Sequence, residues 1–112
     1  KVEEIKKGIK LIQYGYKFDK DNIVFMFKIP ENVEKKEIEY ITIAGSFNDW
    51  NPKNLSYKMT SIVNDVYQFI IPKADLKEKY NEFKFVINGE NWQPVPDNAK
   101  NAKNGNITLV IK

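Results

Sequence analysis

The chain of 112 residues contains no cysteine, no histidine and no arginine. Without cysteine it forms no disulfide and offers no thiolate to a metal ion. Without histidine it lacks the commonest general base, the commonest zinc ligand and one member of every histidine-containing triad. These absences argue against an enzyme and against a metal or other cofactor. We therefore expect a protein without catalysis of its own.

The missing arginine bears on nucleic acids. All eighteen cationic side chains are lysines, and they are dispersed among fifteen carboxylates to give a net charge of +3. Arginine makes bidentate contacts to phosphate and guanine, whereas lysine supplies only a point charge. Lysine and aromatic side chains together can bind single strands by stacking, but dispersed charges of both signs favour a solvated surface. We expect no nucleic-acid partner.

Long apolar runs are also absent, since none approaches the ~18 residues of a membrane span, and no membrane partner is expected. Apolar and polar residues instead alternate with a period of two in short segments separated by turn signals. This pattern is typical of an all-β antiparallel sandwich or barrel of about seven or eight strands. Residues 1–11 are interpreted as a linker or leading segment and 12–112 as one domain. The expected strands are 12–18, 23–29, 40–46, 56–59, 66–71, 82–88 and 107–111, with a helical turn within 73–79, a hairpin turn at 88–91 and a loop at 94–105.

The carboxylates suggest two functions, a calcium site and a glycosidase active site, and the sequence gives weak support to each. Asp19, Asp21 and Asn22 resemble the start of a calcium loop, but the glycine and distal glutamate that complete such a loop are missing, so a turn is favoured. The pairs Asp19/Asp21 and Glu37/Glu39 could supply the acid and base of a glycosidase. Nothing in the sequence indicates an apolar pocket that raises the pKa of one carboxyl. We expect neither a metal site nor catalytic residues.

Aromatic residues are abundant, with seven phenylalanines, six tyrosines and two tryptophans. Most alternate within expected strands, and filling the core explains them; these include Phe25, Phe27, Phe69, Phe83 and Phe85. Trp50 and Trp92 lie instead among amides and prolines, in 48–52 and 89–94. Each either anchors a loop or offers a flat apolar face to a ligand such as a pyranose, whose C–H face stacks while its hydroxyls bond neighbouring amides. The local context leaves both interpretations open.

Two segments carry a family resemblance. Residues 41–50, Ile-Thr-Ile-Ala-Gly-Ser-Phe-Asn-Asp-Trp, resemble the signature strand and loop of carbohydrate-binding module family 48. Residues 83–89, Phe-Lys-Phe-Val-Ile-Asn-Gly, resemble the lysine-bearing hairpin of that family, and Trp92 follows at the matching position. The resemblance extends over about 22–111. It implies an immunoglobulin-like (early-set) antiparallel β-sandwich.

The resemblance also implies a function and a site. The sugar-binding members of the family bind α-1,4-glucan (starch, glycogen, maltooligosaccharides or cyclodextrin). They tether a parent enzyme or complex to the polysaccharide, for example a covalently linked catalytic domain such as a glycoside hydrolase or another glucan-active enzyme. Two tryptophans stack on consecutive glucose rings while a lysine and an asparagine bond the hydroxyls. These roles fall on Trp50, Trp92, Lys84 and Asn106, with Asn48, Asn101 and Asn104 as secondary candidates. The alternative is a structural domain that packs on a catalytic or kinase-type partner without binding sugar.

The chain departs from the family pattern in an insertion at 73–80, in a loosely aligned loop at 98–106 and at individual residues. Some members carry a leucine shortly before the late asparagine, where it inserts into a curved glucan. Here Ala102, Lys103 and Asn104 occupy that stretch, which predicts weaker binding of helical glucan. The hairpin aspartate of the family is Asn88, a change that a turn accommodates.

Overall fold

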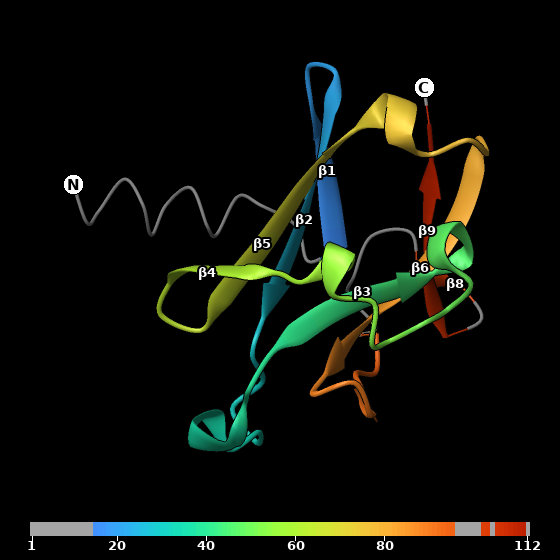
Figure 1. The fold of residues 1–112 in the computed structure, drawn as a ribbon. Coiled ribbons are helices and arrows are strands. Elements are labelled where there is room, and N and C mark those ends of the chain that lie inside the picture. Colours follow the sequence, from blue (N-terminus) through green and yellow to red (C-terminus); the bar gives the residue numbers. More distant parts are fainter. Residues whose placement is uncertain (1–14, 96–101, 104, 112) are drawn as a thin grey trace.

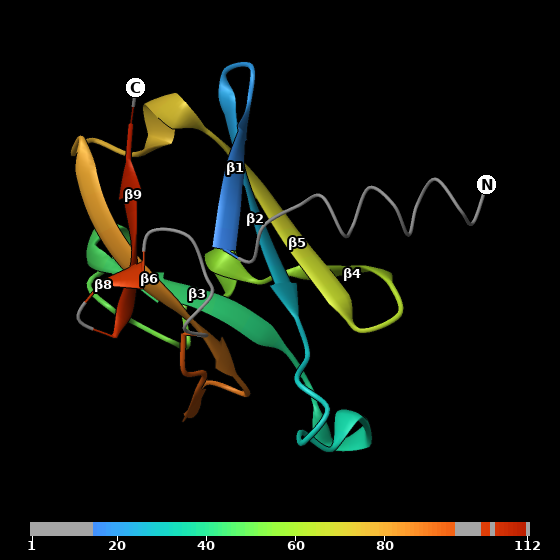
Figure 2. The ribbon, with the colours of Figure 1, turned by 180° about the vertical axis from the view of Figure 1, so that it is seen from behind.

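The computed structural model of the chain describes residues 15–95, 102–103 and 105–111. Two antiparallel sheets pack face to face, which confirms the expected all-β sandwich (Figure 1). The first sheet has the order β1 (Gly15–Asp19), β2 (Asn22–Lys28), β5 (Val66–Pro72) and β4 (Thr60–Val63). The second has the order β3 (Ile41–Gly45), β6 (Tyr80–Ile87), β9 (Asn106–Val110) and β8 (Ala102–Lys103), and β7 (Asn91–Trp92) also pairs with β6. Seen from behind, β6, β8 and β9 lie on the side away from β4 and β5 (Figure 2).

The structure differs from the expected elements at several places, among them β4 and β7, which no expected strand covers. The strand predicted at 56–59 is wrong: η3 is a 3-10 turn there, and the side chain of Asn54 caps it by accepting a hydrogen bond from the Ser56 amide at 3.0 Å. Within the loop expected at 94–105, β8 forms a two-residue strand. The helical turn expected within 73–79 is limited to η4. The described residues contain four 3-10 turns: η1 (Lys35–Glu37), η2 (Ser46–Asn48), η3 (Leu55–Tyr57) and η4 (Lys73–Asp75).

The core lies between the two sheets and is rich in aromatic rings. Phe83 on β6 is fully buried and lies at its centre. Its ring contacts those of Phe25 at 5.0 Å, Phe85 at 5.5 Å, Tyr16 at 6.1 Å and Phe47 at 6.4 Å between centroids. Of the five phenylalanines predicted for the core, Phe25, Phe27, Phe83 and Phe85 are buried, and Phe69 packs against the core half-buried. In the described part of the chain, no helix is long and apolar enough to cross a membrane.

The outer face of the second sheet is partly covered. Strand alternation places Thr42, Ala44, Tyr80, Glu82, Lys84, Val86, Asn106 and Thr108 on this face. Yet Thr42, Ala44 and Val86 are all 0% exposed. The segment 46–58 returns along β3, and the Thr42 hydroxyl donates a hydrogen bond to the Pro52 carbonyl at 2.6 Å. This connection carries Trp50 onto the outer face and leaves Glu82 and Lys84 half-exposed beside it.

Candidate functional site

Trp50 is held in an unusual backbone conformation. It and the preceding Asp49 both lie in the left-handed region, with φ of 56° and 58°. For a bulky residue this conformation is an outlier that costs about 1–3 kcal/mol. The Trp50 amide donates to the Gly45 carbonyl at 2.9 Å. The Asn48 side chain accepts from the Gly45 amide at 2.9 Å and donates to the Ile43 carbonyl at 2.8 Å. Hydrogen bonds to the end of β3 therefore maintain the strained turn, and both ends of the Asn48 amide are engaged in building it.

The start of this turn is packed closely against β6. A Cβ atom at Gly45 would lie 2.5 Å from the Glu82 carbonyl oxygen and 2.8 Å from the Phe83 Cβ. Next to it, the Ser46 hydroxyl accepts from the Glu82 amide at 3.1 Å and donates to the Asn81 side chain at 3.3 Å. Only glycine permits this approach, so the residue fixes the turn relative to the sheet.

Replacing Gly45 with alanine is therefore expected to lower the free energy of unfolding by about 1–3 kcal/mol, because the added methyl meets backbone atoms that cannot move aside. Urea unfolding followed by far-UV circular dichroism measures the change. Gly105→Ala is the matched control, since nothing lies within 4 Å of its Cβ position and only the cost of its φ of +81° remains. Equal destabilisation by the two substitutions would contradict the packing argument.

The hairpin between β6 and β7 carries Trp92. Its turn contains Asn88 and Gly89, with φ of 55° and 72°. The Asn88 side chain accepts from the amides of Glu39 at 2.7 Å and Tyr40 at 3.1 Å, which fastens the hairpin to the segment before β3. Trp92 lies in the short strand β7 rather than in the loop suggested by its neighbours. Because it pairs with Val86, it stands on the outer face of the second sheet.

Trp50 and Trp92 meet on this face. Their ring centroids are 6.4 Å apart and their planes are tilted by 36°. Trp92 is 39% exposed and Trp50 is half-buried. One indole comes from the connection after β3 and the other from β7, and the structure brings them together as an aromatic pair at the solvent boundary.

Lys84 and Asn106 lie on the same face of the second sheet as the pair. Lys84 is half-exposed on β6, opposite Ala44 of β3, which agrees with its predicted outward direction. On the other side of β6, β9 pairs as far as Phe83 and β7 begins at Val86, so Lys84 lies where these two neighbours meet. Asn106 is the first residue of β9 and donates a hydrogen bond from Nδ2 to Glu82 Oε1 at 3.2 Å.

The four principal candidates thus lie on one face around β6, and the structure adds Glu82, which the sequence analysis did not single out. Glu82 lies two residues before Lys84, and this spacing alone could have placed the two side chains on the same face of the strand. The secondary candidates Asn101 and Asn104 lie outside the described residues.

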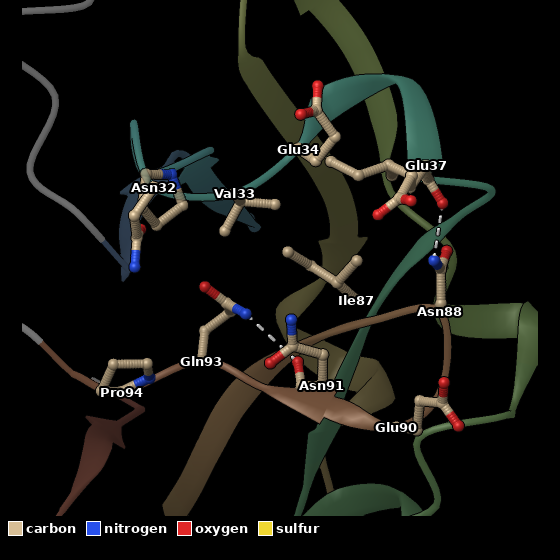
Figure 3. Close-up of a pocket in the computed structure, with 12 residues that line it drawn as sticks. Asn32, Val33, Glu34, Glu37, Ile87, Asn88, Glu90, Asn91, Gln93 and Pro94 are labelled. Carbon is tan, nitrogen blue, oxygen red and sulfur yellow. Dashed lines mark hydrogen bonds between the residues drawn. The ribbon is translucent and has the colours of Figure 1, made fainter.

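A cavity of about 520 Å³ lies nearby but belongs to a different surface (Figure 3). It is enclosed by the connection from β2 to β3 and by the β6–β7 hairpin, with the carboxylates of Glu34, Glu37 and Glu90 at its wall. Asn91 and Gln93 line it, whereas Trp92 between them does not, because alternate side chains of a strand point to opposite faces. Among the residues that the structure describes, no group of three or more acidic side chains is placed to hold a metal ion.

One pKa is displaced near the Trp50 connection. Burial, with a further contribution from the Asp75 carboxylate, raises the pKa of the Tyr57 phenol. This ring stacks on Phe47 with centroids 5.4 Å apart, and the neutral phenol is the form that packs there. The shift therefore reflects packing beneath the connection.

The chain matches no protein-family model, and no curated protein matches it.

Proposed function

We propose that the protein is a non-catalytic module that binds α-1,4-glucan with Trp50 and Trp92. The observation that supports this most is the tilted tryptophan pair at the solvent boundary, with centroids 6.4 Å apart. Backbone strain such as that at Trp50 is concentrated at ligand sites, where the surrounding structure fixes a side chain in advance. A rigid aromatic platform loses little conformational entropy when a ligand binds.

The shape of the pair favours a curved polymer. Successive rings of an α-1,4-glucan turn in the same sense, so the chain curves, whereas a β-1,4-glucan forms a flat ribbon. Two indole planes tilted by 36° match neighbouring faces of the curved chain. Starch, glycogen, maltooligosaccharides and cyclodextrin share this geometry. The resemblance to carbohydrate-binding module family 48 points to the same ligands and the same two tryptophans.

The polar neighbours supply the second half of the recognition. Lys84 offers ammonium donors and Asn106 an amide on the same face of the sheet, as the hydroxyls at the edge of a pyranose require. Stacking contributes roughly 1–2 kcal/mol per ring. After the costs of association, we expect dissociation constants of roughly 1 mM to tens of micromolar. A module of this affinity acts by raising the local concentration of a covalently linked catalytic domain, such as a glycoside hydrolase, at the polymer.

The alternative is a structural domain that packs on a catalytic or kinase-type partner. The contact between the two indoles favours it to some degree, because each ring already has the other as a partner. Exposed aromatic residues are also frequent at protein interfaces.

A titration of the purified protein separates the two functions. We expect β-cyclodextrin, maltoheptaose and glycogen to shift the tryptophan fluorescence in a saturable way, because both indoles lie in the site. Cellohexaose, a flat β-1,4 oligosaccharide, should leave the fluorescence unchanged at the same concentration. Fluorescence that responds to none of the α-glucans would sink the proposal and favour the structural domain.

A further inference from the structure

We propose that Glu82 is a positioning residue of this site. Its carboxylate holds the Asn106 amide with the nitrogen turned inward along the sheet and the oxygen directed to the ligand. This inference rests on the glucan-binding function proposed above, and it names a residue that neither the sequence pattern nor the family resemblance assigns.

The geometry of the contact fixes the orientation of the amide. Asn106 Nδ2 lies 3.2 Å from Glu82 Oε1, and both residues are half-buried on the outer face of the second sheet. Glu82 pairs with Thr108 across β6 and β9, so it is the diagonal neighbour of Asn106. An ionised carboxylate only accepts hydrogen bonds. The amide group that faces it must therefore be the NH₂, and Oδ1 points away from Glu82.

The backbone below Glu82 is firmly held. Its amide donates to the Ser46 hydroxyl at 3.1 Å, and its carbonyl oxygen lies against Gly45. The Asn81 side chain, which accepts from Ser46, also donates to the Glu78 carbonyl at 2.9 Å. The same contacts fix the start of the Trp50 turn. Glu82 and the aromatic platform thus share one support, and the carboxylate is placed relative to the indoles.

This arrangement has a consequence for recognition. The Lys84 ammonium only donates hydrogen bonds, while the held Asn106 amide presents an acceptor. Two adjacent hydroxyls of a glucose ring satisfy both, one by accepting from Lys84 and the other by donating to Asn106. If the amide turned over, its NH₂ would replace the acceptor, and the hydroxyl at this position would have to accept the hydrogen bond and direct its own proton elsewhere. Glu82 therefore selects a ligand with a free hydroxyl that donates at this position.

The first test is a double-mutant cycle on β-cyclodextrin affinity, measured by isothermal titration calorimetry. Glu82→Gln keeps the shape but removes the acceptor-only character, so we expect about a 3- to 10-fold weaker affinity, the value of one hydrogen bond. In the Asn106→Ala background, Glu82→Gln should cause no further loss, because Glu82 acts through Asn106. An equal loss in both backgrounds, or no loss in either, overturns the proposal. Urea unfolding midpoints close to that of the wild type show that each variant is folded.

The second test needs no sugar. In a ¹H–¹⁵N spectrum of the free protein, the side-chain NH₂ signals of Asn106 are identified by their disappearance in Asn106→Ala. We expect Glu82→Gln to shift these signals toward the values of a neutral amide contact, since charge-assisted hydrogen bonds are the stronger ones. Unchanged Asn106 signals would mean that no such bond forms in solution.

The outcomes separate the inference from the function on which it rests. If the wild type binds no α-glucan, the proposed function fails while the spectrum still reports on the Glu82–Asn106 contact. If the wild type binds and Trp92→Ala weakens binding, but Glu82→Gln matches the wild type, the function stands and the positioning role fails.

Discussion

Replacing Trp92 with alanine is expected to lower the affinity for β-cyclodextrin by about 10- to 100-fold, because removing one aromatic stacking partner typically costs about 1–3 kcal/mol. Trp92 is the more exposed indole and stands on a regular strand pair, so its removal should leave the fold intact. From a wild-type dissociation constant of roughly 1 mM to tens of micromolar, such a loss brings binding to the limit of calorimetric detection. Calorimetry gives the dissociation constant of the wild type and at least a lower limit for that of the variant.

Tyr80→Ala is the matched control for this substitution. Tyr80 is 49% exposed on the same face of β6. It is six residues from Val86, the partner of Trp92, so it lies about 20 Å away along the strand. A cyclodextrin ring on the tryptophans does not reach it, and the affinity should stay at the wild-type value. Equal losses from Trp92→Ala and Tyr80→Ala, or none from either, would contradict the placement of the site.

Trp50→Ala is a less clean test of stacking. The left-handed backbone of Trp50 costs free energy, and relaxing it changes the turn as well as the platform. The comparison between the two tryptophans is still informative, because loss of binding in both variants without a change in unfolding indicates a shared platform.

The largest effect on stability is expected at Phe83. Phe83→Ala should lower the free energy of unfolding by about 3–5 kcal/mol, as is usual for a buried phenylalanine cut back to alanine. The side chain is fully buried and contacts rings of both sheets and of η2. Since a domain of this size has only about 5–15 kcal/mol of stability, the variant should be close to unfolding at 25 °C.

Urea unfolding measures this loss, and Phe83→Leu serves as the graded control. Leucine keeps much of the volume, so a smaller loss of about 1.5 kcal/mol or less is expected. Phe83→Ala within ~0.5 kcal/mol of the wild type would be typical of a surface residue and would contradict the central position of this ring.

Local patterns were enough to predict most of the fold. The expected strands 23–29 and 82–88 match β2 and β6 nearly to their ends. Along β6 the phenylalanines alternate with polar residues, whereas β2 is a short apolar run that is buried on both faces. The direction of Lys84 followed from the same alternation. The error at 56–59 has a local cause as well: the Asn54 cap favours a 3-10 turn over the strand that the spacing suggested.

The alternation of apolar and polar residues could not predict that part of the outer face of the second sheet is buried. Val86 reads as an outward residue in the sequence but is 0% exposed. Its partner across the ladder is Trp92, and the Trp50 connection returns over β3 beside it. A hydrophobic period of two indicates on which face of the strand a side chain lies. Whether other parts of the chain cover that face depends on the path of the connections.

The sequence by itself determined the class of fold, the exclusion of histidine and cysteine chemistry from this chain, and the identity of the two tryptophans that lie among amides and prolines. Only the tertiary structure decided that Trp50 and Trp92 lie 6.4 Å apart, and that Glu82 reaches Asn106. The physical reason is the separation along the chain over which each kind of interaction acts. Hydrophobic period and turn chemistry act between near neighbours in the chain, whereas the site is assembled by sheet pairing between segments that are distant in sequence.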